Sequence, residues 1–174
     1  MWFKHLRAIL LLPTVVTMLV PWMLIASPNA QLLVLAPAVR ALTIVLGVLL
    51  IATGLSMLVW TGRLLATEGR GTLAPWDATT QLVARGPYRH VRNPMMFGVF
   101  SILLGEALAF GVRGMFAWFA IFVAINAVYI PLLEERLLER RFGESYRRYK
   151  ANVPRWIPRL RPWRDAGATG NFGG

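Results

Sequence analysis

Four long apolar stretches alternate with polar segments along the chain. They cover residues 8–26, 41–60, 95–111 and 115–133, and Glu106 is the only charged residue inside any of them. Each is long enough, or nearly so, to cross a hydrocarbon core about 30 Å thick. Because lipid leaves no water to hydrogen-bond an irregular backbone, all four should be helices. The pattern predicts an all-α, polytopic membrane protein with about four transmembrane helices.

The polar segments between and after these stretches divide the rest of the chain. A loop of about thirty residues separates the second and third stretches, and its glycines and prolines predict turns and a structured loop. An ordinary connector with aromatic anchors is the alternative interpretation. A C-terminal helix is expected after the fourth stretch. The organisation predicted is a single membrane-embedded domain over residues 1–164, followed by a small, Gly-rich tail over residues 165–174 that should be disordered.

The basic residues fix the expected orientation. Of the 19 lysines and arginines, all but Arg40 and Arg113 lie before the first stretch, between the second and third, or after the fourth. The positive-inside rule then places both termini and the long loop in the cytosol. The net charge of +11 therefore indicates contact with anionic lipid head groups and not with nucleic acid. The hydrophobic share of 56% and the mean hydropathy of +0.53 agree with a membrane address. Arginine strongly outnumbers lysine, a weak pointer to a bacterial plasma membrane.

Several kinds of chemistry are excluded by composition. The chain has no cysteine, which removes disulfides, thiolate nucleophiles and Cys-based zinc sites. It has two histidines, His5 and His90, and two aspartates, Asp77 and Asp165. Two histidines are too few for a His-rich metal site, so no metal is expected. A Ser-His-Asp triad is disfavoured as well. No Gly-rich phosphate loop of Walker or Rossmann form is present.

The third apolar stretch begins in a way that suits an anion. Asn93 is a good N-cap and Pro94 is well placed at the first helical position. The free N–H groups and the positive dipole end of this helix would face the cytosol, with Arg89 and Arg92 just before them. A ligand carboxylate would be well received there. The alternative is that any membrane helix starting inward uses such a cap and such arginines.

The fourth stretch runs directly into two carboxylates, Glu134 and Glu135. Pro131 should kink the helix just before them. Adjacent helical residues point about 100° apart, so only one of the two should face inward together with Leu138. Pairing with nearby arginines is one interpretation of this acidic pair. The other is that one carboxylate receives the amino group of a zwitterion, of which the methionyl end of S-adenosylmethionine (SAM) is an example.

Three blocks in order resemble a known superfamily. They read GRGTLAP, LVARGPYRHVRNP and EERLLERRFGESYRRYKANVPRWIP. Together they resemble the isoprenylcysteine carboxyl methyltransferase and phospholipid methyltransferase superfamily of integral-membrane enzymes, over residues 69–158. The resemblance implies SAM as cofactor and methyl transfer to a lipophilic or small nucleophilic acceptor at the cytosolic membrane face. Residues 69–158 would then form the cofactor half, with a pocket over the last two membrane helices.

The resemblance also implies which residues contact the cofactor. They are Thr80, Gln81, Leu82, Val83, Tyr88, Arg89, Asn93, Pro94, Met95, Met96, Glu134 and Glu135. The catalytic residues stay unknown.

This chain departs from the family pattern at three positions. It has Asn93 where the family usually has a histidine, and Met96 where it usually has a tyrosine. It also has Ile130 where the prenylcysteine enzymes have an arginine that looks to serve the substrate carboxylate. A lipid amine, a small thiol or another apolar nucleophile is therefore at least as good an expectation for the acceptor.

Two other functional classes stay open at this point. One is an NADPH-dependent membrane reductase, because sterol reductases resemble this superfamily in their C-terminal half. The other is a non-catalytic membrane protein of the same fold. The expected partners are membrane lipid and a lipophilic or small-molecule methyl acceptor. The sequence gives no indication of the oligomeric state or of the pathway.

Overall fold

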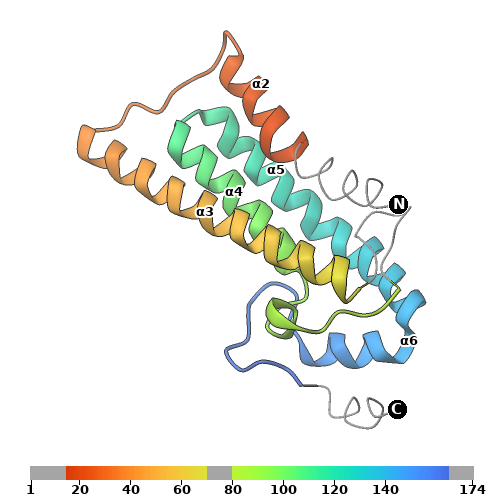
Figure 1. The fold of residues 1–174 in the computed structure, drawn as a ribbon. Coiled ribbons are helices and arrows are strands. Elements are labelled where there is room, and N and C mark those ends of the chain that lie inside the picture. Colours follow the sequence, from red (N-terminus) through yellow and green to blue (C-terminus); the bar gives the residue numbers. More distant parts are fainter. Residues whose placement is uncertain (1–14, 70–79, 165–174) are drawn as a thin grey trace.

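The computed structural model describes residues 15–69 and 80–164, and every regular element in those ranges is a helix (Figure 1). An isolated bridge between Leu32 and Val112 is the β pairing found in that part of the chain. The all-α expectation is therefore confirmed. The elements are η1 (Val15–Leu19), α2 (Val20–Ala26), α3 (Pro37–Thr67), η3 (Gly86–Arg89), α4 (Pro94–Phe110), α5 (Arg113–Tyr129), η4 (Ile130–Glu134) and α6 (Glu135–Asn152).

Two helical segments are long and apolar enough to cross a membrane. They are α3 and the continuous run from α5 through α6, Arg113–Asn152. The apolar helices Val15–Ala26 and Pro94–Phe110 are shorter. The first expected span begins in residues 8–14, which lie outside the described residues, as do residues 70–79 of the long loop and the 165–174 tail. Four crossings therefore stay a prediction.

Helix α3 presents apolar side chains outward. Only 11% of its most apolar window is buried, and Val45, Leu49 and Leu55 are all more than half exposed. A soluble core helix would bury these side chains, whereas lipid is an apolar solvent that accommodates them. This surface is that of a membrane protein.

Glycines bring α3 and α4 into backbone contact. On α3, Gly47 and Gly54 lie seven residues apart, and they face Gly105 and Gly98 of α4. A Cβ atom added to Gly54 would lie 2.5 Å from the Gly98 carbonyl oxygen, and one added to Gly47 would lie 2.5 Å from that of Gly105. Small residues allow this close approach in membrane helix pairs.

A tight connection joins α4 to α5. Gly111 ends α4 in the left-handed conformation at φ 71°, which a glycine adopts without strain. Arg40 of α3 donates to the free carbonyls of Leu108, Ala109 and Phe110 at 3.2, 2.7 and 3.2 Å. The cation therefore caps the negative end of α4.

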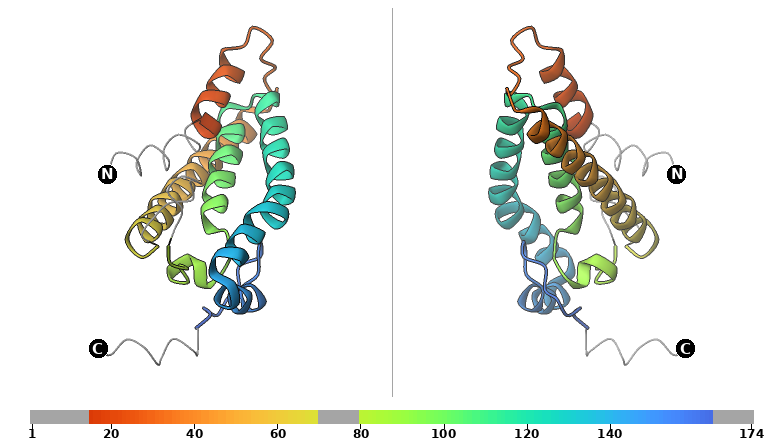
Figure 2. Two further views of the ribbon diagram at one scale, coloured as in Figure 1. Left: turned by 90° about the vertical axis from the view of Figure 1, so that its right-hand side faces the viewer. Right: turned by 90° about the vertical axis from the view of Figure 1, so that its left-hand side faces the viewer.

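The last helix changes geometry twice. Pro131 lies in a π-helical turn, η4, because it has no N–H to donate to the regular pattern. The expected distortion at Pro131 is thus present, yet the helix continues through it. A sharper reversal, which the sequence did not predict, occurs at Gly143, where φ is 53° and ψ is −126°. Figure 2 shows the result: α6 and the C-terminal segment gather at the end of the bundle opposite α2.

Candidate functional site

The reversal at Gly143 builds a small apolar and aromatic core at this end of the molecule. Past Gly143, α6 turns Tyr146 and Tyr149 inward, where both are 2% exposed. They pack with Val153 against Leu82, Leu138 and their neighbours. The Tyr149 hydroxyl donates to the Tyr88 backbone carbonyl at 2.7 Å. This bond fixes the Gly86–Arg89 turn against α6.

The C-terminal segment is joined to Arg89 and His90 by backbone and side-chain hydrogen bonds. Arg159 N–H donates to the His90 carbonyl at 3.0 Å, and His90 Nδ1 meets the Arg159 carbonyl at 2.7 Å. Trp163 N–H donates to the Arg89 carbonyl at 2.9 Å, and Arg89 Nε donates back to the Trp163 carbonyl at 2.6 Å. These two reciprocal pairs hold residues 159–163 as a wall beside the start of α4.

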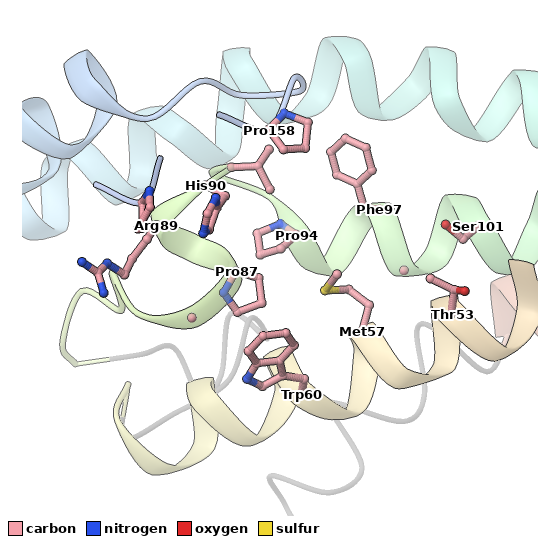
Figure 3. A pocket seen from close by; sticks show the side chains of 14 residues that line it. Thr53, Met57, Trp60, Pro87, Arg89, His90, Pro94, Phe97, Ser101 and Pro158 are labelled. Atoms are coloured by element: carbon pink, nitrogen blue, oxygen red, sulfur yellow. The ribbon is translucent and has the colours of Figure 1, made fainter. Parts of the chain in front are cut away.

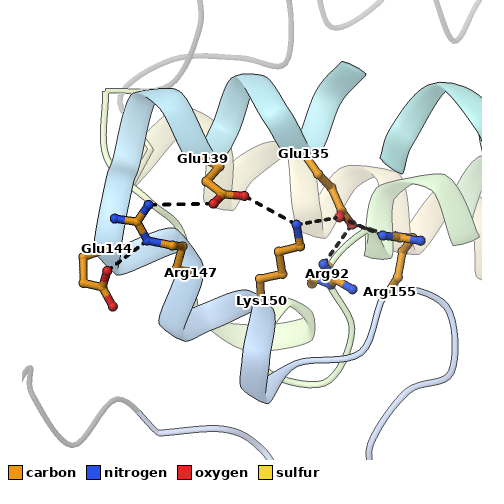
Figure 4. A network of polar contacts seen from close by, with 7 residues as sticks. All are labelled: Arg92, Glu135, Glu139, Glu144, Arg147, Lys150 and Arg155. Carbon is orange, nitrogen blue, oxygen red and sulfur yellow. Dashed lines mark hydrogen bonds and ion pairs between the residues drawn. The ribbon is translucent and has the colours of Figure 1, made fainter. Parts of the chain in front are cut away.

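Glu135 is the centre of an ion-pair network (Figure 4). Its carboxylate accepts from Arg155 Nε and NH2 at 2.7 and 2.8 Å and pairs with Arg92 NH1 at 2.9 Å. Lys150 lies 3.8 Å away. Burial pushes the pKa of Glu135 upward, but the Arg155 hydrogen bond and the charges of Arg92, Arg155 and Lys150 outweigh it, so the pKa is lowered. Glu135 is therefore ionised and fully engaged.

Glu134, its neighbour, faces the other way and lines a small cavity. The apolar stretch of the sequence ends at Leu133, so Glu134 directly follows the span predicted over residues 115–133. The cavity has a volume of about 60 Å³. Its lining comes from four parts of the chain, namely the end of α3, residues 81–96, Glu134 and α6: Leu65, Gln81, Leu82, Val83, Tyr88, Arg92, Asn93, Met95, Met96, Glu134, Leu138, Phe142, Tyr146 and Tyr149.

Polar groups in this cavity lack partners. The Tyr88 hydroxyl and Asn93 Nδ2 are buried with no hydrogen bond. No hydrogen bond or ion pair to the Glu134 carboxylate forms within residues 15–69 and 80–164. Buried polar groups are almost always paired, so several orphans around one cavity call for an explanation. Two unpaired donors and an unpaired carboxylate around one cavity could satisfy a ligand that carries both charges.

Burial shifts the titration of both groups. It raises the pKa of Glu134 to about 7, and the charge of Glu135 adds to the shift. Burial also raises the pKa of Tyr88, with Glu134 as the second cause, so the phenol stays a donor. A cation in the cavity would restore the charged form of Glu134, because it would supply the missing opposite charge.

Eight of the side chains predicted to contact a cofactor line this cavity: Gln81, Leu82, Val83, Tyr88, Asn93, Met95, Met96 and Glu134. Of the acidic pair, Glu134 alone lines this cavity together with Leu138. The expectation that only one of the two would face inward holds for the cavity but not for burial, because Glu135 is 1% exposed in its ion-pair network. Asn93 does take the N-cap position of α4, yet its side chain makes no cap hydrogen bond. Its amide is left for the cavity.

The other four predicted contacts lie elsewhere. Thr80 is exposed, and Glu135 points into the ion-pair network. Arg89 and Pro94 line a second cavity on the opposite side of residues 86–94. The turn at Gly86–Arg89 and the residues after it divide their side chains between the two cavities, which a linear motif does not reveal.

Sequence reasoning missed part of the lining. Arg92 was predicted only as a flanking cation, and Tyr146 and Tyr149 were not singled out. The two tyrosines lie three apart on one helical face within the block ESYRRY. That spacing was the available signal, but the reversal at Gly143 decides where the face points.

One comparison with known proteins gives a family match. The sequence model of the phospholipid methyltransferase family matches residues 42–145. The matched range holds every side chain that lines the Glu134 cavity except Tyr146 and Tyr149. No curated protein and no solved structure matches the chain.

Proposed function

The chain belongs to the phospholipid methyltransferase family, and on this premise we propose that it transfers a methyl group from SAM to a lipophilic acceptor at the cytosolic membrane face. The family match favours methyl transfer and gives no support to the reductase alternative. The observation that carries the cofactor assignment is the set of unpaired groups around the Glu134 cavity.

These groups suit the methionyl end of SAM. Glu134 has no partner in the described chain and would accept the α-ammonium group. The Tyr88 hydroxyl and Asn93 Nδ2 are buried donors without acceptors and would bind the α-carboxylate, with the Arg92 charge nearby. Hydrogen bonds to ionised groups are the stronger ones, so both ends of the zwitterion would be held firmly. Gln81, Leu82, Val83, Met95 and Met96 are proposed as the apolar and polar surroundings of the rest of the cofactor.

The size of the cavity sets a further condition. At about 60 Å³ it is well below the roughly 300–1,000 Å³ of typical small-molecule sites. We therefore propose that the side chains of Gln81, Leu138 and Phe142 separate when the cofactor binds. Thr80, Arg89, Pro94 and Glu135 are not part of this proposal, because their side chains do not line the cavity.

The chemistry asks for position more than for acid–base catalysis. SAM supplies a methyl group already activated on a sulfonium, so the leaving group is built in. The chain must hold the two reactants in line and keep water out. Met95, Met96, Leu138 and Phe142 are well placed to exclude water. The absence of an evident acid–base dyad in the sequence agrees with this division of labour.

The acceptor is proposed to be a lipid amine or another nucleophile without a carboxylate. Ile130 occupies the position where the related prenylcysteine enzymes have an arginine, and it is fully buried at 0% exposure. Ile130 therefore supplies no positive charge to a substrate carboxylate one helical turn before Glu134. Tritiated methyl transfer should be measured with extracted membrane lipids, small thiols and farnesyl-cysteine. Strong activity on farnesyl-cysteine would show that Ile130 is not diagnostic.

The topology proposed with this function has four spans, both termini in the cytosol and a single domain over residues 1–164. Its support is the basic asymmetry, in which Arg40 and Arg113 alone lie on the outer side. Reporter fusions after Arg40 and Arg113 should read external, and fusions after Gly71 and Gly167 internal. An external C-terminus would place the Glu134 cavity away from cytosolic SAM and contradict the proposal.

Equilibrium binding to the detergent-purified protein is the decisive test of the function. SAM and NADPH should be titrated separately against the full chain. Binding of SAM without binding of NADPH supports the proposal. Binding of NADPH alone would restore the reductase alternative, and binding of neither would favour a non-catalytic protein.

A further inference from the structure

A second, larger cavity lies on the opposite side of residues 86–94 from the Glu134 cavity. Its volume is about 600 Å³, within the usual range for ligand sites. The two cavities share no lining residue. The larger one is bounded by α3, the start of α4, the Gly86–Arg89 turn and the C-terminal segment (Figure 3).

The lining changes character from one end to the other. Met57, Trp60 and Phe97 give an apolar channel between α3 and α4, and Thr53 and Ser101 lie at its far end in Figure 3. Thr53 and Trp60 are exposed on the lipid-facing side of α3, so the channel is open to the surroundings of that helix. The shape suits a hydrocarbon chain that enters sideways from the membrane.

Arg89 lies at the other end of the larger cavity. Arg89 lines the cavity with its stem, and its guanidinium points away from the apolar lining in Figure 3. Its Nε is engaged with the Trp163 carbonyl. Its two terminal nitrogens make no hydrogen bond within the described ranges, residues 15–69 and 80–164. Pro158 and Pro162 complete the wall. They belong to the segment 153–164, which contains four arginines and no acidic residue.

We infer that this cavity binds one anionic phospholipid, with an acyl chain along Met57 and Phe97 and the phosphate beside Arg89. An apolar channel that ends at a cation matches an amphiphile with a negative head. The orientation expected from the basic residues puts this end at the cytosolic leaflet, which carries anionic lipid. The inference goes beyond the proposed function and does not depend on it.

This lipid is distinct from the methyl acceptor. Methyl transfer needs reacting atoms about 3–3.5 Å apart. Residues 86–94 stand between the larger cavity and Glu134, and their side chains divide between the two sides. A lipid in the larger cavity would instead brace the C-terminal wall and the turn at Gly86–Arg89, whose Tyr88 lines the Glu134 cavity.

Native mass spectrometry of the full chain, released from detergent without SAM, tests the inference. Phosphatidylglycerol, phosphatidylcholine, a fatty acid and inorganic phosphate should be added in turn. One phosphatidylglycerol should be retained, with at least tenfold preference over phosphatidylcholine. Inorganic phosphate should compete poorly, because it cannot fill the channel. Equal retention of all lipids, or competition by phosphate alone, would overturn the inference.

Two variants separate the chain and head contacts. Thr53→Trp should fill the channel and lower phosphatidylglycerol affinity at least tenfold. Ser56→Trp is its matched control: Ser56 is also exposed on α3 and makes the same intrahelical bond, at 2.8 Å, but lies outside the lining. Arg89→Gln should remove the preference for the anionic lipid, whereas Arg85→Gln should retain it. SAM binding by Thr53→Trp should stay within about twofold of wild type. Unchanged lipid affinity in both Thr53→Trp and Arg89→Gln would exclude this cavity as the site.

Discussion

The α3–α4 pair and the polar head (residues 80–93 and 134–163) are held together in opposite ways. In the helix pair, Gly47 and Gly54 allow backbone-to-backbone contact with Gly105 and Gly98. The charged contact between these helices is at one end, where Arg40 caps the last carbonyls of α4. In the polar head, Glu135 joins Arg92, Arg155 and Lys150, while neighbouring groups stay unpaired. The first region is held mainly by close backbone packing, although Glu106 Oε2 on α4 is also buried without a partner in the described part of the chain. The second gathers several unpaired polar groups around one cavity, and we assign ligand binding to those groups.

The largest effect is expected from Glu135→Gln, which would break the polar head. Glu135 is 1% exposed and neutralises Arg92 and Arg155. Removing one partner of a buried ion pair typically costs ~3–5 kcal/mol, because the other charge is left uncompensated. The thermal midpoint in detergent should fall strongly. Glu139→Gln is the control, since the Glu139 side chain is 33% exposed and its pairs with Lys150 and Arg147 are longer. A similar loss in both variants would contradict the central role of Glu135.

Gly54→Leu tests how far the α3–α4 pair depends on close backbone contact. Its side chain would meet the Gly98 carbonyl, a backbone atom that cannot move aside alone. Overpacking of this kind costs about 1–3 kcal/mol or more. The yield of monodisperse protein and the thermal midpoint should fall, while SAM affinity of the folded fraction stays near wild type. Ala52→Leu, at an exposed position of the same helix, should be tolerated. A selective loss of SAM affinity in Gly54→Leu would show that the two regions are not separable.

Features that depend on local sequence could be predicted, whereas those that depend on contacts between distant segments could not. Apolar runs predicted the helices because hydropathy and backbone satisfaction are local properties. The helical offset of about 100° predicted that one carboxylate of the acidic pair would face inward with Leu138. Motif resemblance predicted Tyr88, Asn93 and Met95 in one place, and the cavity gathers them.

The remaining features depend on contacts between distant segments. Glu135 belongs to an ion-pair network because Arg92 and Arg155 come from elsewhere in the chain. Arg89 turns away from the Glu134 cavity because residues 159–163 fasten it. No spacing in the sequence encodes either pairing. The reversal at Gly143 was likewise hidden, since the surrounding residues continue a helical pattern on both sides.

Glu134→Gln tests whether a carboxylate of the polar head serves binding and not stability. The substitution would remove the charge proposed to accept the cofactor ammonium group, a contact worth about 1.5–3 kcal/mol. SAM affinity should fall roughly ten- to hundred-fold. Stability should be unchanged or higher, because an unpaired, partly buried carboxylate is replaced by a neutral amide. Isothermal titration with SAM, beside a thermal scan, separates this result from that of Glu135→Gln. Wild-type affinity in Glu134→Gln would remove Glu134 from the site.

The pH dependence of SAM binding should be about tenfold between pH 6 and pH 8. Glu134 binds an ammonium group only when ionised, and burial raises its pKa to about 7. Affinity should therefore rise with pH through about 7 and then level off, at roughly tenfold per pH unit below that pKa. The same titration affects stability. Because folding raises the pKa of Glu134, the folded chain binds the Glu134 proton more tightly than the unfolded chain does. The Glu134 contribution to stability should consequently fall as pH rises from 4.5 to about 7. Glu134→Gln should flatten the binding profile over this interval. A profile that persists in the variant would assign the titration to another group.

The smallest effect is expected from Gly143→Ala, which probes how the polar head is shaped. Gly143 has φ 53° and ψ −126°, a conformation that side-chain-bearing residues rarely adopt, yet a Cβ there would meet nothing within 4 Å. The penalty is therefore conformational, about 1–3 kcal/mol. It is partly offset by the lower entropy of the unfolded chain, about 0.4–1 kcal/mol.

The net loss should be about 1 kcal/mol and confined to the head, because Gly143 returns Tyr146, Tyr149 and Lys150 toward Glu135. Hydrogen exchange should speed up over residues 144–163 and stay unchanged over α3 and α4. Ser145→Ala, at an exposed helical position two residues on, is the control and should leave exchange unaltered. Faster exchange that spreads into α3 and α4 would contradict this prediction. It would mean that the α3–α4 pair and the polar head unfold as one cooperative unit.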